Sequence, residues 1–139
     1  MSKKLLEPGL PRGFEDSFGK SLVIEKKIKE VIEKIFLRYG YTEIKTSPFE
    51  YSENIGGFLT DDLNDFSKDI FTFDDKDRKI SLRFDLSAPL ARVVSEKYLE
   101  FAFPFRRFQI AEVFRNETSK TGRGRYRSFL QGDFDQIFF

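Results

Sequence analysis

The sequence predicts an α+β domain in which an antiparallel sheet is flanked by helices. Three observations predict this class: a long amphipathic segment near the start, two alternating segments joined by a polar turn, and two long alternating segments near the end. Strands linked by hairpins pair in antiparallel order, with helices packed on one side of the sheet. The 139 residues suffice for one domain with one core.

The first helix is predicted over Ser17 to Tyr39. Its apolar residues recur at spacings of three and four, and this periodicity places them in one stripe: Ile24, Ile28, Val31, Ile32, Ile35 and Tyr39. Gly40 follows as a stop signal. The residues before the helix carry Pro8 and Pro11 and are expected to be extended.

A strand is predicted over Tyr41 to Ser47, because polar and apolar residues alternate there; Pro48 ends it. The stretch from Glu50 to Lys68 is rich in Asn, Asp, Ser and Gly, which indicates a loop. Within it we expect one short helical turn around Asp61 to Phe66.

A hairpin is predicted from Ile70 to Phe73 and Lys79 to Asp85, across the polar turn at residues 74–77. A helix is predicted over Leu86 to Tyr98, with Pro89 in its first turn, where a proline is tolerated.

Two long strands, Phe105 to Arg115 and Arg125 to Ile137, are predicted to be joined by the polar loop Asn116 to Gly124. Successive side chains of a strand point to opposite faces. One face of the last strand carries Arg125, Arg127, Phe129, Gln131, Asp133 and Asp135. The opposite face is mixed and carries Tyr126, Ser128, Leu130, Gly132, Phe134 and Gln136.

The strand before the second helix alternates in the same way. Ile80, Leu82 and Phe84 share one face, and Ser81, Arg83 and Asp85 share the other. The sheet is therefore predicted to bury one face and to hold the other open and polar. A solvated outer surface would also alternate in this way. The grouping of cations, an aromatic ring and carboxylates favours instead a ligand with a flat ring, an anionic part and a cationic part.

Composition excludes several classes of function. The chain contains neither Cys nor His, which excludes a disulfide framework, a thiol nucleophile and the commonest general base and metal ligand. The net charge is +1, so any binding of nucleic acid must be local. No apolar run resembles a signal peptide or reaches membrane-spanning length, and a cytoplasmic protein without a membrane partner is the default expectation.

Four short sequence motifs resemble those of a known family. They are Pro11-Arg12-Gly13-Phe14, the segment 82–92 (LRFDLSAPLAR), Phe114-Arg115-Asn116-Glu117, and the segment 124–135 (GRYRSFLQGDFD). In this order they resemble histidyl-tRNA synthetases, which are class II aminoacyl-tRNA synthetases. Residues of about 105–137 look like motif 2, and about 22–48 look like motif 1, which builds the dimer interface in class II enzymes.

The resemblance implies an ATP site and gives each residue a role. Arg115 would contact the α-phosphate and the histidine carboxylate, for which a guanidinium offers fixed paired donors. Glu117 would accept from the adenine amino group, Phe129 would stack on adenine, and Arg125 would pair with the pyrophosphate end. The alternative interpretations are a surface salt bridge between Arg115 and Glu117 and ordinary core packing of Phe129. For Arg127 two interpretations stay open: a contact in the ATP site, or only a brace for its strand.

The resemblance also implies an amino-acid pocket lined by Asp85, Ser87, Gln131 and Asp135. Carboxylates accept from the ammonium of histidine and from an imidazole N–H, whereas a phenyl or aliphatic ligand would leave them unpaired. Asp85 could equally cap the following helix, and the two roles are compatible. Ser87 stands where Thr is usual in the family, and Asp85 where many bacterial members carry Glu; neither change removes an acceptor.

The implied reaction is attack of the histidine carboxylate on the ATP α-phosphorus, followed by transfer of the histidyl group to tRNA(His). Mg²⁺ would arrive with the nucleotide, and no motif in the chain forms a protein metal site. Lys120 and Arg123, in the loop between the long strands, would meet the tRNA acceptor end; the alternative is a solvated turn. A homodimer through motif 1 is expected.

The resemblance covers residues 1–139 as the N-terminal portion of a catalytic domain. A third class II motif and the anticodon-binding domain are not found in this sequence, so the chain alone is expected not to aminoacylate tRNA. One alternative is the synthetase-like regulatory subunit of ATP phosphoribosyltransferase. The other is a non-catalytic module for dimerisation or tRNA binding.

Overall fold

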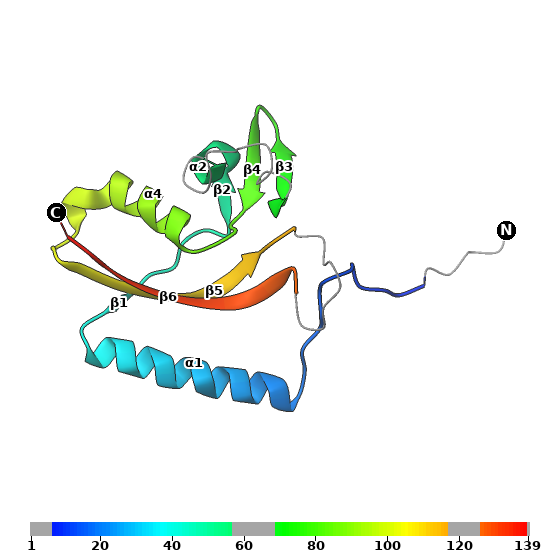
Figure 1. The fold of residues 1–139 in the computed structure, drawn as a ribbon, viewed down its shortest axis with the longest axis horizontal. Coiled ribbons are helices and arrows are strands. Elements are labelled where there is room, and N and C mark those ends of the chain that lie inside the picture. The colour runs from blue at the N-terminus through cyan, green and yellow to red at the C-terminus, as the bar shows by residue number, and fades with distance from the viewer. Residues whose placement is uncertain (1–6, 57–68, 117–125, 139) are drawn as a thin grey trace.

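The computed structural model describes residues 7–56, 69–116 and 126–138, in an α+β arrangement of two three-stranded sheets and flanking helices (Figure 1). Along the chain the elements are α1 (Lys20–Arg38), β1 (Thr42–Glu43), β2 (Phe49–Tyr51), α2 (Ser52–Gly56), β3 (Thr72–Asp75), β4 (Arg78–Leu82), α4 (Ser87–Lys97), the short 3-10 helix η2 (Tyr98–Glu100), β5 (Phe105–Phe114) and β6 (Ser128–Ile137). The predicted class is confirmed, although the strands form two sheets and not one.

The larger sheet has the strand order β1-β5-β6. The two long strands β5 and β6 pair in antiparallel order, from Phe105 opposite Ile137 to Phe114 opposite Ser128. The short strand β1 lies parallel to β5 on its other side, which makes β5 the central strand. The predicted hairpin of long strands is thereby confirmed.

The segment predicted as one strand over Tyr41 to Ser47 contributes only β1 to the larger sheet. The N–H of Ile44 donates to the Phe108 carbonyl at 3.0 Å, and the chain then crosses to the smaller sheet as β2. Pro48 lies at this crossing, where its carbonyl accepts from the Arg83 N–H at 2.9 Å. The predicted strand is thus present but shorter, because the chain leaves β5 after Ile44 to reach the other sheet. Pro48 directly precedes β2, an edge strand, a position that prolines tolerate.

The smaller sheet has the order β2-β4-β3 and is antiparallel throughout. Its β3–β4 hairpin is the predicted one, with the turn at residues 76–77. The central strand β4 buries Ser81, whose hydroxyl is 2.7 Å from that of Ser52 and 3.0 Å from that of Thr72. The hydroxyl ladder ties the sheet to α2.

Helix α1 ends where the sequence predicts, at a glycine. Gly40 has a φ of +75°, which L side chains rarely adopt. This turn brings the Tyr41 N–H to the Phe36 carbonyl at 3.0 Å and the Gly40 N–H to the Leu37 carbonyl at 3.1 Å. These two bonds are a Schellman cap, and they satisfy carbonyls that a helix end leaves free.

Helix α1 packs on the larger sheet mainly through Phe36, whose ring lies 5.2 Å from that of Phe108 and 5.0 Å from that of Phe134. A hollow of about 350 Å³ separates the first half of the helix from Ile110 and Leu130. Most of the predicted apolar stripe is therefore exposed rather than buried: Ile24, Ile28, Val31, Ile35 and Tyr39. Such a face is unusual for a surface helix.

Helix α4 lies on the opposite side of the larger sheet from α1, as Figure 1 shows. The helices thus flank both sides, where the sequence suggested one. Pro89 occupies the first turn of α4, as predicted. Leu90 and Val94 of this helix form a core with Phe105, and Ile44, Phe101, Phe103 and Ile137 pack against it.

The expectation of an open polar face is wrong, because the polar faces of the strands point inward. In β4, Ser81 is buried while Ile80 and Leu82 are only half-buried. In β5, Arg107 and Gln109 are buried, whereas Leu130 and Phe134 on the opposite face of the sheet are exposed. Alternation defines two faces but does not tell which one is covered. Several of these covered polar groups are paired, Gln109 with Thr46 and Ser81 with Ser52 and Thr72, which makes their burial tolerable.

Candidate functional site

The candidate site is the inward face of the β5–β6 pair, on the side of α4 and the smaller sheet. Residues directly opposite each other share a face of an antiparallel pair. The register therefore places four cross-strand pairs in one row: Val113 with Phe129, Ala111 with Gln131, Gln109 with Asp133, and Arg107 with Asp135. Predicted site residues thus lie together on a rigid element, with an aromatic ring at one end and carboxylates at the other.

The aromatic end of the row is formed around Arg115. Its guanidinium lies 4.4 Å from the ring centre of Phe84 and 5.0 Å from that of Phe129. The Arg115 N–H donates to the Arg127 carbonyl at 2.8 Å, which fixes the backbone just beyond β5. A cation held between two rings is attracted to their faces and is restricted in orientation.

The Nε of Arg115 is buried and has no hydrogen-bond partner in the part of the chain that the structure describes. The guanidinium as a whole is half-buried, and its fork geometry matches carboxylate and phosphate oxygens, so it is suited to an anion. Phe129 is half-buried beside it and keeps part of its ring accessible.

The acidic end of the row is organised by Arg107, which the sequence reasoning missed. The Arg107 side chain has no exposed surface and forms an ion pair with the carboxylate of Asp135. Burial lowers the pKa of the Arg107 guanidinium, while the neighbouring carboxylates of Asp135, Asp133 and Asp85 act in the opposite direction. Alternation within β5 groups Arg107 with Gln109 and Ala111, but only the pairing with β6 places this group on the same face as Asp135.

The neighbouring side chains complete this end. The amide nitrogen of Gln131 donates to both carboxylate oxygens of Asp133, at 3.1 and 3.2 Å. Gln131 is thus held by its own strand. Three carboxylates and one guanidinium share the region, so it suits a ligand that presents positive charge or N–H donors.

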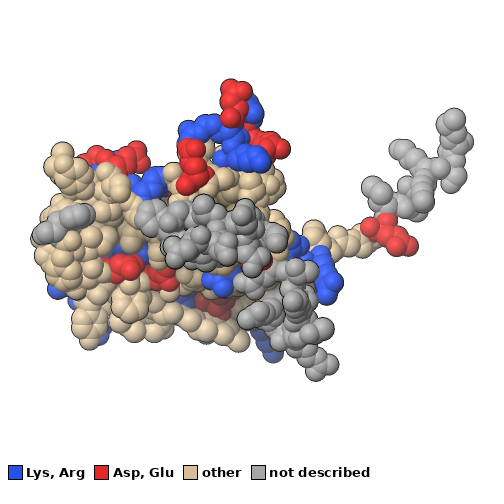
Figure 2. All heavy atoms as spheres, turned by 45° about the horizontal axis from the view of Figure 1, so that its top comes forward, with Lys and Arg blue, Asp and Glu red and all other residues tan. Residues whose placement is uncertain are grey.

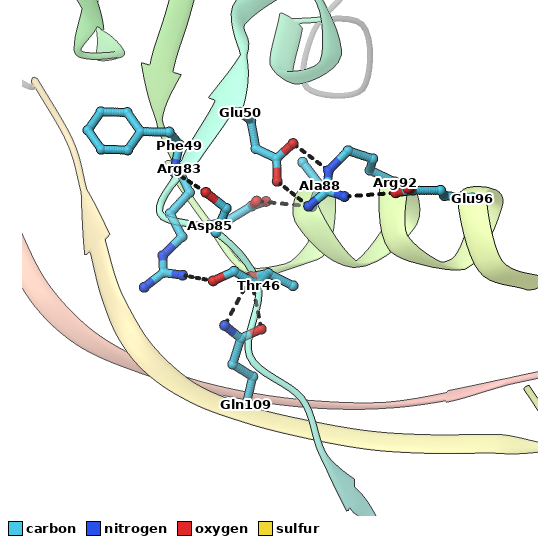
Figure 3. A network of polar contacts seen from close by, with 10 residues as sticks. Thr46, Phe49, Glu50, Arg83, Asp85, Ala88, Arg92, Glu96 and Gln109 are labelled. Carbon is cyan, nitrogen blue, oxygen red and sulfur yellow. Dashed lines mark hydrogen bonds and ion pairs between the residues drawn. The ribbon is translucent and has the colours of Figure 1, made fainter. Parts of the chain in front are cut away.

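Asp85 caps the helix that follows it, which is the alternative role considered for this residue from the sequence. Its carboxylate accepts from the Ala88 N–H at 3.2 Å, in the first turn of α4 (Figure 3). The same carboxylate lies close enough to Arg107 to act on its pKa, so capping and a place at the acidic end coexist. Ser87 is exposed at the start of α4, and its side chain makes no hydrogen bond to the row as far as the structure describes the chain.

Arg127 holds the N-terminal segment against the start of β6. Its N–H donates to the Gly13 carbonyl at 2.7 Å, and its Nη1 donates to the Arg12 carbonyl at 3.3 Å. Its guanidinium lies 4.5 Å from the ring centre of Phe71 and 5.6 Å from that of Phe14. Two of the four motifs, residues 11–14 and residues 124–135, are therefore in direct contact through Arg127.

A buried polar network holds the chain around the acidic end in place (Figure 3). Glu50 of β2 is a buried carboxylate that accepts from Nε and Nη2 of Arg92 at 2.6 and 2.8 Å, and Arg92 also donates to Glu96 at 3.3 Å. The hydrogen bond to Glu50 is the main cause of a raised pKa of Arg92. This clamp fixes α4, and with it Asp85, against the smaller sheet.

Arg83 makes a second junction between the sheets. Its Nε donates to the Glu112 carbonyl at 2.7 Å and its Nη1 to the Thr46 carbonyl at 3.1 Å. Its backbone carbonyl accepts from the Phe114 N–H at 3.0 Å. Burial lowers the pKa of Arg83, although Glu112 and Glu50 oppose this. The bond to Phe114 aligns the strand that leads directly into Arg115.

Several predicted features lie outside the described part of the chain. They are the residues Glu117, Arg125, Lys120 and Arg123, and the helical turn expected over Asp61 to Phe66. Over the described residues, no helix is long and apolar enough to cross a membrane. No group of three or more His, Cys, Asp or Glu within residues 7–56, 69–116 and 126–138 could hold a metal ion.

Figure 2 views the molecule with the side of α4 and the smaller sheet turned forward. Lys and Arg alternate with Asp and Glu over this face, which agrees with the net charge of +1. Recognition of a charged ligand here depends on individual side chains and not on a field of one sign. A long ligand with an anionic, ring-bearing end and a cationic end would match the row from Arg115 to Asp135.

Comparison with known proteins identifies a family. The family model described as histidyl-tRNA synthetase matches residues 13–132. A histidine–tRNA ligase of Pelagibacter ubique is 49% identical over 132 residues, which cover 95% of this chain and 28% of that protein. The histidine–tRNA ligase of Caulobacter vibrioides is 39% identical over 132 residues, or 94% of this chain and 26% of its own length.

Solved structures give the same result. The histidyl-tRNA synthetase of a Nostoc species superimposes with a TM-score of 0.79 at 26% identity, over 94% of this chain and 29% of that one. A Bacillus halodurans protein, described as an ATP phosphoribosyltransferase regulatory subunit/histidyl-tRNA synthetase, gives 0.79 at 25% identity, over 96% of this chain and 33% of its own. The chain thus spans between about a quarter and a third of the length of these relatives.

Proposed function

Since the chain belongs to the histidyl-tRNA synthetase family, we propose that the full-length protein activates histidine with ATP and transfers the histidyl group to tRNA(His). The observation that carries the proposal is the row on the inward face of β5 and β6, with Arg115 between aromatic rings at one end and carboxylates at the other. An aminoacyl adenylate has a matching order of groups: a flat base, a phosphate and an amino acid with N–H donors.

The Arg115 end is proposed to take ATP. The guanidinium would contact the α-phosphate, where its fork geometry suits phosphate oxygens. Phe129 would stack on the adenine ring, since its side chain is only half-buried. Glu117 and Arg125 are proposed to contact the adenine amino group and the pyrophosphate end. Mg²⁺ enters as part of the nucleotide substrate.

The acidic end is proposed to take histidine through Asp85, Ser87, Gln131 and Asp135. Carboxylate and amide oxygens accept from the α-ammonium and the imidazole N–H groups. A ligand without these donors leaves buried acceptors unpaired, and the resulting penalty gives selectivity for histidine over apolar amino acids.

The proposed reaction needs positioning and charge stabilisation rather than a nucleophile from the protein. The histidine carboxylate oxygen attacks the α-phosphorus, the bond to pyrophosphate breaks, and negative charge builds on the phosphate oxygens. Arg115 stabilises this charge, since it is fixed in orientation before the reaction begins. The lack of His and Cys in the chain is compatible with such chemistry.

We assign residues 1–139 to the N-terminal portion of a class II catalytic domain, with motif 1 at about 22–48 and motif 2 at about 105–137. The exposed apolar side chains of α1 support a homodimer through motif 1, because a second copy would cover them. Lys120 and Arg123 are proposed to meet tRNA phosphates, and the cytoplasm is the proposed location.

A regulatory subunit of ATP phosphoribosyltransferase is the second candidate, because one structural neighbour carries both names. Histidine-dependent exchange of pyrophosphate into ATP by the full-length gene product separates the two. A synthetase exchanges label only when histidine is present. Its Arg115→Ala variant is expected to exchange about 10²–10³-fold more slowly, as for the loss of one charge-stabilising donor. A folded wild-type protein that gives no exchange would favour the regulatory subunit.

A further inference from the structure

Arg107 is a buried cation on the central strand of the larger sheet. It lies on the central strand β5, opposite Thr42 of β1 on one side and opposite Asp135 of β6 on the other. Its side chain is fully buried, whereas the Asp135 side chain keeps 40% of its surface exposed. The ion pair between them therefore joins a fully buried cation to a carboxylate that stays partly exposed to solvent.

The surroundings of Arg107 differ from those of an ordinary structural ion pair. Its Nε and Nη1 have no hydrogen-bond partner among the described residues, and the carboxylates of Asp133 and Asp85 lie near. A buried guanidinium is expensive to desolvate, and an apolar residue of similar size often stabilises a fold equally well. The arrangement is better explained by what the cation does to Asp135.

We propose that Arg107 is a positioning residue of the histidine pocket: it holds one carboxylate oxygen of Asp135 and thereby presents the other to an imidazole N–H of histidine. The inference rests on the proposed function. A free aspartate samples several rotamers, and fixing one of them before the ligand arrives removes an entropic cost of binding. Histidine affinity then depends on Arg107 although Arg107 does not touch the ligand.

The neighbouring Arg106 provides a matched control. It precedes Arg107 on the same strand, is exposed, and pairs in register with Gln136 on the opposite face of the sheet. Arg106→Met removes the same charge from the same strand without reaching the pocket. Arg107→Lys keeps the charge but loses the planar fork that fixes a carboxylate.

The test measures pyrophosphate exchange by the full-length protein, with histidine and ATP varied separately. Arg107→Met is expected to raise the KM for histidine by about 10- to 100-fold, the effect of losing one charge-assisted hydrogen bond. The KM for ATP is expected to stay within about twofold, since Arg115 and Phe129 are untouched. Arg107→Lys should recover part of the loss, and Arg106→Met should behave as wild type.

A double-variant cycle separates positioning from general damage. If Arg107 acts through Asp135, then Arg107→Met combined with Asp135→Asn is no worse for histidine than Asp135→Asn alone. The double variant also removes both charges together, so it stays informative where Arg107→Met alone does not fold. Additive effects of Arg107→Met and Asp135→Asn on the KM for histidine would overturn the inference, and so would an unchanged KM for histidine in the Arg107 variants. In both cases histidine-dependent exchange by the wild-type protein would still uphold the proposed function. Wild-type protein without exchange would overturn both.

Discussion

Gly13 provides a sharp test of how the N-terminal segment is held on the site. The residue has a φ of +85°, and a Cβ placed on it would lie 2.5 Å from Cδ and 2.6 Å from Cγ of Arg127. Arg127 has little freedom to retreat, because its guanidinium lies 4.5 Å from the ring centre of Phe71 and its Nη1 donates to the Arg12 carbonyl.

Gly13→Ala is therefore expected to destabilise the fold by two effects. A left-handed backbone costs a non-glycine residue about 1–2 kcal/mol. Displacing the Arg127 side chain from its rotamer costs about 0.5–1.5 kcal/mol more. The expected sum, about 1.5–3.5 kcal/mol, is measurable as a lower midpoint of urea unfolding, followed by far-ultraviolet circular dichroism.

Two other glycines separate these effects. Gly40 has a φ of +75°, and a Cβ added there would have nothing within 4 Å, so Gly40→Ala reports backbone strain without a clash. Gly132 in β6 has only an ordinary contact, Ile110 Cγ1 at 3.7 Å, so Gly132→Ala should be neutral or slightly stabilising. A Gly13→Ala variant as stable as Gly132→Ala would refute the reasoning. Equal losses at Gly13 and Gly40 would show that the contact with Arg127 contributes nothing to the effect.

Three further outcomes are expected. Glu50→Gln leaves Arg92 without its buried charge partner and should cost about 1–3 kcal/mol in urea unfolding, discounted because Arg92 is 31% exposed; a loss near zero would contradict the clamp. A hydrogen bond to Glu15 raises the pKa of Tyr126. Glu15→Gln should therefore lower the pH at which the Tyr126 phenol ionises, followed by the absorbance of the phenolate. The raised pKa belongs to the folded state, so the contribution of this hydrogen bond to stability is present below the ordinary tyrosine pKa and is lost as pH rises through the raised pKa of Tyr126. An unchanged titration of Tyr126 in the Glu15 variant would count against the hydrogen bond. Asp135→Asn should raise the KM for histidine about 10- to 100-fold and leave that for ATP within about twofold; the reverse pattern would remove Asp135 from the histidine pocket.

The regular elements were predictable because their signals are local. The spacing of apolar residues located α1, and the positive φ that only glycine adopts readily explains why the helix ends at Gly40. Pro89 could be placed in the first turn of α4 because the first turn needs no N–H donor there. The β3–β4 and β5–β6 hairpins followed from alternation alone.

What could not be predicted depends on contacts between distant segments. Alternation marked Ser81, Arg83 and the odd-numbered residues of β6 as one kind of face, but the second sheet and α4 decide that this face is inward. Strand β2 was missed because three residues after a proline carry almost no pattern of their own. Tertiary pairing with β4 creates the strand.

The candidate site was predicted in part. Phe129, Gln131 and Asp135 share one face because they are spaced by two or four along a strand, and this much is fixed by the sequence pattern. Arg107 needed the register of β5 against β6, which no single strand reveals. The capping bond of Asp85 was foreseen as an alternative. Its place in the histidine pocket stays a prediction.

The most direct test of the site is a crystal structure of the full-length protein with a non-hydrolysable histidyl-adenylate analogue. We expect the adenine against Phe129, the phosphate mimic beside Arg115 and the imidazole within hydrogen-bond distance of Asp135. An analogue bound away from the inward face of β5 and β6, in a protein that is otherwise folded as described, would contradict the proposed site.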